Sequence, residues 1–132
     1  MRTDLIDGPV LAGSRALTDY LFARLAHAPS EQFRVLFLNA AARLLRDEPM
    51  GEGSVSEAPI YPREVIRRAL ELGATALIIV HNHPSGDPSP SKQDIAITRE
   101  IALAAGFFGI TIFDHVIVSK RGCVSFKERG LL

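Results

Sequence analysis

One hydrophobic run and the polar segment that follows it constrain this chain most. The run, Ala74 to Val80, leads directly into the segment HNHPSGDPSPSKQD, which begins at His81. A short run of this kind, bounded by a glycine and a proline-rich loop, predicts a buried strand. Alternate side chains of a strand share one face, so His81 and His83 can point at the same spot. The chain is therefore expected to build a sheet in which a buried strand ends in two imidazoles on one side.

A carboxylate, Asp94, follows His83 after ten intervening residues. Together, His81, His83 and Asp94 would supply three nitrogen or oxygen ligands. Three protein ligands and one water form the arrangement of a catalytic zinc site, whereas structural zinc sites usually take all four ligands from the protein. From the spacing alone, a metal site and a structural pair of histidines both remain open.

Asp94 also has a second explanation, because Ser91 and Asp94 have the spacing of a helix capping box. In that role Ser91 caps a helix, and Asp94 in its first turn reaches back to the Ser91 N–H and favours the helix dipole. A carboxylate in a first turn is held rigidly, so the roles of cap and ligand are compatible. The loop before Ser91 lacks the Gly-Lys-Ser/Thr of a phosphate-binding loop.

Composition narrows the class of protein. The chain of 132 residues has the length of one domain, and its 47% hydrophobic and 23% charged residues are typical of a globular protein. Acidic and basic residues balance at 15 each, which offers no electrostatic case for binding nucleic acid. Arg63, Arg67 and Arg68 cluster on one predicted helix, and a solvated helix face is the simpler interpretation.

Two absent features bear on the expected location of the protein. Cys123 is the single cysteine, so no internal disulfide forms, and nothing nearby would lower its pKa for a role as a nucleophile. The N-terminus lacks the pattern of a signal peptide, and no apolar run approaches the roughly 18 residues of a membrane span. We therefore expect a cytoplasmic protein that has no contact with membranes.

Hydrophobic periodicity predicts one domain of helices around one mixed sheet, over residues 14–132, after an N-terminal arm or linker remnant at 1–13. The segment from Pro49 to Pro59 is expected to be a loop with a short strand around Val55. Ser125 and Glu128 have capping-box spacing for a short terminal helix. Helices are predicted at 14–28, from Pro62 to the stop at Gly73, and at 91–106 with Gly106 as its C-cap; strands are predicted at 32–38, 43–47, 74–81, 109–113, 116–119 and 123–126.

Hydrolysis at a zinc site also needs a general base. The candidates are Glu31, Glu52, Glu57 and Glu64. Glu64 is explained by the dipole of its predicted helix, and Glu52 and Glu57 lie in the predicted loop. Glu31 directly precedes the strand at 32–38, whose buried residues would anchor it, so it is the best placed of the four.

These residues resemble a known signature. His81-x-His83-Pro84, followed by Ser91-x-x-Asp94, is similar to the JAMM (MPN+) pattern of metalloproteases, which has a distant upstream Glu, then His-x-His-Pro, then Ser-x-x-Asp. The longer string VHNHPSGDPSPSKQDIAITREI, with YPREV before it and Asp114-His115 and RGLL after it, is similar to the RadC family of bacterial proteins. The resemblance covers residues 14–132.

The resemblance implies an α/β (α+β) fold of the cytidine-deaminase-like JAB/MPN type, in which helices flank a mixed β-sheet. It implies zinc as the cofactor, with His81, His83 and Asp94 as its ligands. Ser91 would steady the water on zinc or the tetrahedral intermediate, and Glu31 would be the general base. The implied activity is that of a zinc-dependent metallopeptidase that cleaves a peptide or isopeptide bond in an unidentified protein or peptide.

Which residue occupies the position of the general base stays open. The family pattern places the Glu immediately before the apolar strand, and here Gln32 stands between Glu31 and Phe33. A shift of one residue would put Gln32 in that position, and a glutamine cannot act as a base. Because the facing of a strand reverses with each residue, this register decides whether the site contains a base.

Other functions are compatible with parts of this pattern. A non-catalytic scaffold or DNA-repair accessory domain that keeps the fold is the alternative. A nuclease or phosphoesterase would need the carboxylate cluster of a two-metal site, and a deaminase would need His-x-Glu and Pro-Cys-x-x-Cys, which this chain lacks. RadC proteins commonly carry a helix-hairpin-helix region that is thought to touch DNA, and none precedes Ser14, so we expect little contact with DNA. His115 is either a structural histidine or a group that supports the site.

Overall fold

The computed structural model describes residues 15–52 and 59–132, and these build one five-stranded mixed sheet. The strand order is β2-β1-β3-β4-β5, and neighbouring strands are antiparallel except for β3 and β4, which are parallel and joined through α4. The predicted fold, helices around one mixed sheet, is confirmed. The elements are α2 (Arg15–Leu25), β1 (Gln32–Leu38), β2 (Leu44–Glu52), α3 (Pro62–Leu72), β3 (Ala76–Asn82), α4 (Lys92–Gly106), β4 (Thr111–Ser119) and β5 (Gly122–Ser125).

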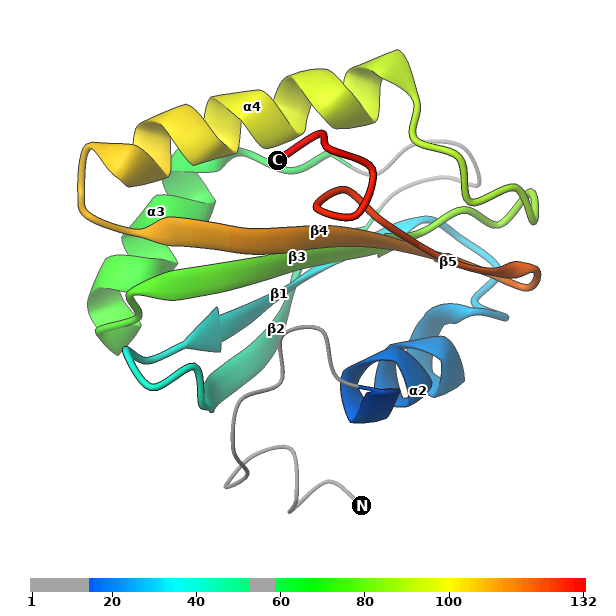
Figure 1. Ribbon diagram of the computed structural model, residues 1–132, viewed down its shortest axis with the longest axis horizontal. Helices are drawn as coiled ribbons and strands as arrows, with labels where there is room; N and C mark the ends of the chain where they lie inside the picture. Colours follow the sequence, from blue (N-terminus) through cyan, green and yellow to red (C-terminus); the bar gives the residue numbers. More distant parts are fainter. Residues whose placement is uncertain (1–14, 53–58) are drawn as a thin grey trace.

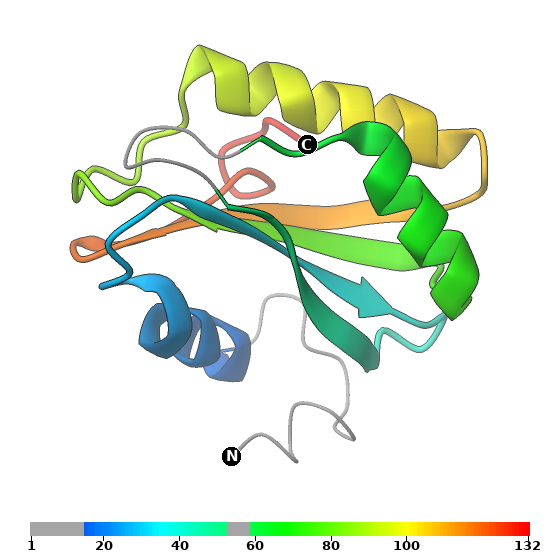
Figure 2. The same cartoon turned by 180° about the vertical axis from the view of Figure 1, so that it is seen from behind.

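The sheet is the middle layer of three. Helices α3 and α4 cover one face and α2 covers the other (Figure 1, Figure 2). Strand β3 is buried along its whole length, as predicted. Its Leu77 and Ile79 pack in the cluster with α3 and α4, and Ile78 and Val80 pack in the cluster with α2. By this alternation, His81 belongs to the face that α4 covers.

Local sequence signals set several boundaries as predicted. Pro62 opens α3, where the missing N–H does no harm. Gly73 closes that helix in the left-handed conformation, with a φ of 72°. Ser91 caps α4, and the reciprocal bonds of the capping box with Asp94 are both present.

The predicted loop from Pro49 is wrong as far as Glu52, because β2 runs on to that residue. Strand β2 lies at the edge of the sheet, where a proline is tolerated because no further strand needs its N–H. Gly51 also has a packing reason: a Cβ built on it would lie 2.0 Å from the Pro59 carbonyl oxygen. The short strand expected around Val55, the arm at 1–13 and a cap at Ser14 lie outside the described residues.

Beyond shifts of one or two residues at the ends of other elements, such as β3 and β5, four further differences from the prediction stand out. The two strands expected at 109–113 and 116–119 are one strand, β4, because the polar pair Asp114-His115 is accommodated inside it. Helix α2 ends at Leu25 rather than near residue 28. Helix α4 runs through Gly106, and Gly109 takes the left-handed conformation instead, with a φ of 70°.

The fourth difference is at the C-terminus, where residues 126–130 form turns instead of a helix. Ser125 Oγ accepts the Glu128 N–H at 3.1 Å, which is one of the bonds of a capping box. Gly130, with a φ of 74°, then reverses the chain after a single turn, and Leu131 N donates to the Phe126 carbonyl at 2.8 Å. The left-handed glycine therefore ends the segment before a helix can form.

The charged surface of α3 is neutralised by acidic partners. Arg67 pairs with Glu64 and Glu71 at 2.8 Å each, and Arg68 pairs with Glu48 at 2.6 Å. This agrees with the interpretation of a solvated helix face. Within 15–52 and 59–132, none of the helices combines the length and the apolar character that crossing a membrane requires.

Candidate metal centre

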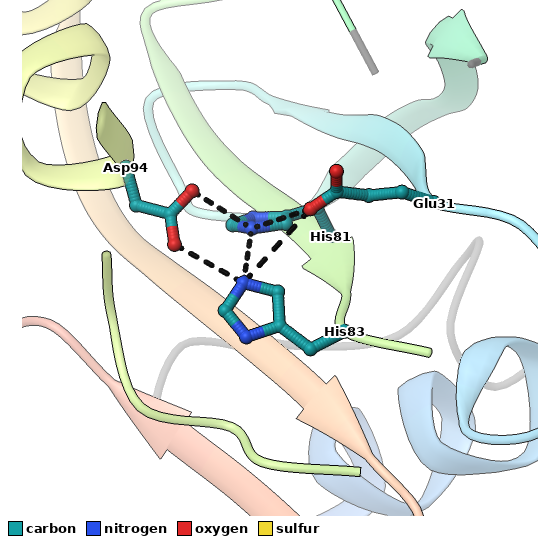
Figure 3. Close-up of side chains that lie close together, drawn as sticks. All are labelled: Glu31, His81, His83 and Asp94. Carbon is teal, nitrogen blue, oxygen red and sulfur yellow. Dashed lines mark hydrogen bonds and ion pairs between the residues drawn. The ribbon is translucent and has the colours of Figure 1, made fainter. Parts of the chain in front are cut away.

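The candidate centre lies where the C-terminal end of β3 meets the first turn of α4. His81 is in β3, and His83 follows the strand directly. Strand β1 enters antiparallel to β3 with Phe33 opposite His81, which brings Glu31, just before β1, to the same end of the sheet. Asp94 comes from the first turn of α4. Figure 3 shows that the four side chains, from three separate parts of the chain, point toward one another.

The distances between these atoms fit a single metal ion. Nε2 of His81 lies 3.1 Å from Nε2 of His83 and 3.2 Å from Oδ1 of Asp94, and Nε2 of His83 lies 3.1 Å from Oδ2 of Asp94. Glu31 Oε2 is slightly farther away, 3.5 Å from His81 Nε2 and 3.9 Å from His83 Nε2. With metal–ligand bonds of about 2.0–2.1 Å, the ligands of a tetrahedral ion are roughly 3.3 Å apart. The four residues could therefore hold a metal ion.

The donor set also fits a cation chemically. His83 Nδ1 donates to the carbonyl oxygen of Asp87 at 2.8 Å, and a carbonyl can only accept. In the neutral ring, Nε2 of His83 is therefore unprotonated, and it faces the carboxylates of Asp94 and Glu31. Groups that carry only lone pairs repel one another around a shared point unless a cation lies between them. Imidazole nitrogen and carboxylate oxygen are ligands that divalent metal ions take readily.

The pKa shifts differ among the members of the cluster. Burial acts to raise the pKa of Asp94, but the rings of His81 and His83, which can donate to the carboxylate when they are protonated, outweigh it and hold that pKa well below its usual range. Burial lowers the pKa of His81. Burial also acts to lower the pKa of His83, but the hydrogen bonds with Asp94 and with the Asp87 carbonyl, together with the charge of Asp94, raise it overall. Asp94 is thus ionised at neutral pH and available as a ligand.

The capping box formed by Ser91 and Asp94 also contributes to the candidate site. Ser91 Oγ accepts the Asp94 N–H at 2.9 Å, and the Ser91 N–H donates to Asp94 Oδ2, also at 2.9 Å. The capping box therefore orients the carboxylate toward the two histidines. Ser91 lines the cavity beside the cluster, and its oxygen is engaged as an acceptor, so its hydroxyl proton can be donated into the cavity.

Glu31, rather than Gln32, belongs to the cluster. Its side chain is largely buried and meets both histidines, while the backbone N–H of Gln32 donates to Asn82 Oδ1 at 2.7 Å. Asn82 Nδ2 donates to the Ser30 carbonyl at 3.0 Å. The buried Asn82 side chain thus holds the backbone on both sides of Glu31. Our sequence interpretation missed this residue, although a buried asparagine between two histidines was the available signal.

The remaining candidates lie elsewhere or behind the site. Glu64 is on the surface of α3 and pairs with Arg67, and Glu57 lies outside the described residues. His115, which the sequence left open, is fully buried, and its Nε2 lies 2.7 Å from His81 Nδ1. It therefore contacts the cluster through His81 and is not among the residues that line the cavity.

A cavity of about 650 Å³ opens beside the cluster. Its walls come from the start of β1, the segment before α3, the loop after β3 and one face of α4. They carry both apolar and polar side chains. The lining residues are Glu31, Phe33, Pro59, Ile60, His83, Pro84, Ser85, Ser91, Gln93, Asp94, Ala96, Ile97 and Glu100.

Comparison with known proteins finds a matching family and similar proteins. The model of a family described as a RadC-like JAB domain matches residues 11–131. A UPF0758 protein of Rhodobacter capsulatus is 50% identical to this chain over 131 residues, which are 99% of this chain and 61% of that protein. The chain therefore spans less than two thirds of the length of this relative.

Proposed function

The chain belongs to the family of RadC-like JAB domains, and from this premise we propose that it is a zinc-dependent hydrolase of JAMM type that cleaves a peptide or isopeptide bond. One observation carries the proposal: Glu31, His81, His83 and Asp94 converge at one point beside a cavity. A metal site next to a space for substrate is what a metallopeptidase requires.

His81, His83 and Asp94 would hold the ion. They supply two imidazole nitrogens and one carboxylate, and their ligand atoms are 3.1–3.2 Å apart. Two histidines and one carboxylate form a known ligand set of catalytic zinc, which leaves one position open. When bound, zinc acts as a Lewis acid that polarises a carbonyl and lowers the pKa of water to about 7.

Glu31 is the proposed general base. Its carboxylate lines the cavity and lies 3.5 Å from the nearest of the histidine nitrogens, so it would be within reach of a water molecule beside the ion. As the water oxygen bonds to the carbonyl carbon, Glu31 accepts its proton. Glu31 then gives the proton to the amine nitrogen as the carbon–nitrogen bond breaks, and the carboxylate returns to its starting state. Asn82 would keep Glu31 in position through the backbone of Ser30 and Gln32.

Ser91 is the proposed donor to the oxyanion. As the carbonyl carbon becomes tetrahedral, negative charge develops on its oxygen, and a fixed donor there lowers the barrier. The Ser91 hydroxyl is fixed by the helix cap and lines the cavity. The substrate would be a protein or peptide segment whose apolar side chain packs against Phe33, Ile60 and Ile97.

The decisive variant is Glu31→Gln, which keeps the shape of the side chain and removes the base. We expect about one zinc ion per chain in both proteins by mass spectrometry. Hydrolysis of a library of linear and isopeptide-linked peptides by the zinc-loaded variant should fall by about 10²–10⁴-fold. Glu64→Gln, at an exposed carboxylate on α3, is the matched control and should stay fully active.

Two outcomes would contradict the proposal. Equal hydrolysis by wild type and Glu31→Gln would remove Glu31 from the reaction. Zinc bound by the wild type without hydrolysis of any library member would favour the alternative, a scaffold or DNA-repair accessory domain that keeps the metal site.

A further inference from the structure

A buried chain of hydrogen bonds runs from His81 away from the cavity. His81 Nδ1 lies 2.7 Å from His115 Nε2, and His115 Nδ1 lies 2.5 Å from Thr98 Oγ1. Thr98 Oγ1 donates in turn to the backbone carbonyl of Asp94 at 2.7 Å. The side chains of His81 and His115 are fully buried, and Thr98 is 1% exposed. This series of hydrogen bonds therefore links two proposed metal ligands, His81 and Asp94, through two residues that the proposed function does not use.

The carbonyl acceptor at the end of this series determines which atom donates in each of its hydrogen bonds. A backbone carbonyl can only accept, so the single hydroxyl proton of Thr98 goes to the Asp94 oxygen. Thr98 Oγ1 must then accept from His115, whose proton is on Nδ1. Full burial disfavours a charged imidazole, and a neutral imidazole has one N–H. His115 Nε2 is therefore an acceptor, and His81 donates to it from Nδ1.

Nε2 of His81 is therefore unprotonated, and this is the atom that faces Asp94, His83 and Glu31. We propose that Thr98 and His115 form a relay that fixes the tautomer of His81, with its lone pair aimed into the metal site. The inference rests on the proposed function, since zinc is the ion that this lone pair would bind. Thr98 and His115 are positioning residues, because they act through His81.

Packing holds both rings of the relay in place. Phe33 stacks on His81 with the ring centroids 4.3 Å apart, and Phe126 stacks on His115 at the same distance. Stacked neighbours restrict rotation of the imidazoles and exclude water from their faces. Hydrogen bonds from the outer nitrogen of a ligand histidine to its surroundings typically change metal affinity by about 10–100-fold. Here that effect would be controlled by one hydroxyl group on α4.

The test compares Thr98→Val, which removes the hydroxyl at nearly constant volume, with Thr98→Ser, which keeps it. Long-range proton–nitrogen NMR of the metal-free full chain reads which nitrogen of each histidine carries the proton. In the wild type and Thr98→Ser we expect His81 and His115 both protonated at Nδ1. In Thr98→Val we expect mixed tautomers for both rings. Zinc affinity, measured against a chromophoric chelator, should fall by about 10–100-fold in Thr98→Val only.

His27→Gln, at an exposed histidine outside the cluster, should bind zinc like the wild type. Wild-type His81 protonated at Nε2 would overturn the relay without any variant. Unchanged tautomers and zinc affinity in a folded Thr98→Val protein would overturn it as well. Failure of hydrolysis with zinc bound would contradict the proposed function and leave the relay standing, because the tautomers are read without zinc or substrate.

Discussion

His81 lies on the buried side of the candidate centre and His83 on the side that opens into the cavity, although one residue separates them in the chain. The side chain of His81 is 0% exposed, and that of His83 is 15% exposed. The outer nitrogen of His81 meets another buried side chain, His115, and that of His83 meets the backbone of the loop at Asp87. The sheet thus orients one histidine, and a proline-rich loop orients the other.

The difference shows how one strand end can supply both rigidity and access. A ring packed between strands, such as His81, can be supported only by other core residues, so its partners must come from distant parts of the sequence. A ring at the rim, such as His83, can use the nearest backbone carbonyl and still face solvent. Catalytic sites commonly combine a rigid scaffold with an accessible loop in this way.

The largest expected effect comes from removing each histidine. His81→Ala and His83→Ala should both abolish stoichiometric zinc binding, measured by mass spectrometry of purified protein. Their metal-free stabilities should differ. Loss of the packed His81 ring should cost about 2–4 kcal/mol of unfolding free energy because it leaves a cavity, and loss of His83 at the rim should cost about 1 kcal/mol or less. Urea unfolding of the metal-free proteins measures this difference.

Equal destabilisation by the two substitutions would break the comparison, because it would mean that the buried and open sides contribute alike to the fold. Retention of zinc by either variant would remove that histidine from the proposed ligand set.

The next effect is a dependence on pH that separates the two rings. Burial lowers the pKa of His81, so its protonation opposes folding as the pH falls below about 6.5. The pKa of His83 is raised, mainly through Asp94, so its protonated form adds stability below about pH 6.5, and that stability is lost as the pH rises through the raised pKa. In metal-free protein, NMR titration should therefore show His83 titrating above His81.

Zinc affinity should decrease as His83 becomes protonated at lower pH. A ligand histidine must be deprotonated, so below the raised pKa of His83 the affinity should fall by up to about tenfold per pH unit. Competition titrations between pH 5.5 and pH 8 would measure this. A titration of His81 above that of His83 would contradict the assignment of the buried and open sides.

The smallest effect on zinc is expected at Asn82, between the two histidines. Its side chain bonds to the backbone around Glu31 and to neither ring. Asn82→Ala should leave zinc affinity within about threefold, lower the unfolding free energy by about 1–3 kcal/mol because buried backbone groups lose partners, and lower the turnover number through the displaced Glu31. Loss of zinc with unchanged turnover in the zinc-loaded protein would reverse this assignment.

Several features followed from local sequence because their causes are local. Pro62, Gly73 and the Ser91–Asp94 capping box act within one turn of a helix, and each does what its spacing predicted. The hydrophobic run before His81 is the buried strand β3, because a strand covered on both faces needs apolar residues throughout. The pair at His81 and His83, on one side of the strand end, required only the two-residue period of a strand.

Other features could not be predicted, because the deciding partners are far apart in the chain. Strand β4 continues through Asp114 and His115 only because the buried imidazole of His115 finds partners in β3 and α4. Strand β2 continues through Pro49 because it lies at an edge, and strand order is a property of the assembled sheet. The choice between Glu31 and Gln32 depended on the register of β1 against β3.

A mixed fold, a buried strand that ends in two histidines, and a capped helix whose first turn carries Asp94 all follow from the amino-acid sequence alone. The assembled sheet was needed to show that Glu31 meets these residues, that Asn82 holds the backbone around Glu31, and that Thr98 and His115 lie behind His81. Periodicity and capping act over a few residues, whereas a cluster of this kind is assembled from the ends of elements that the sheet brings together.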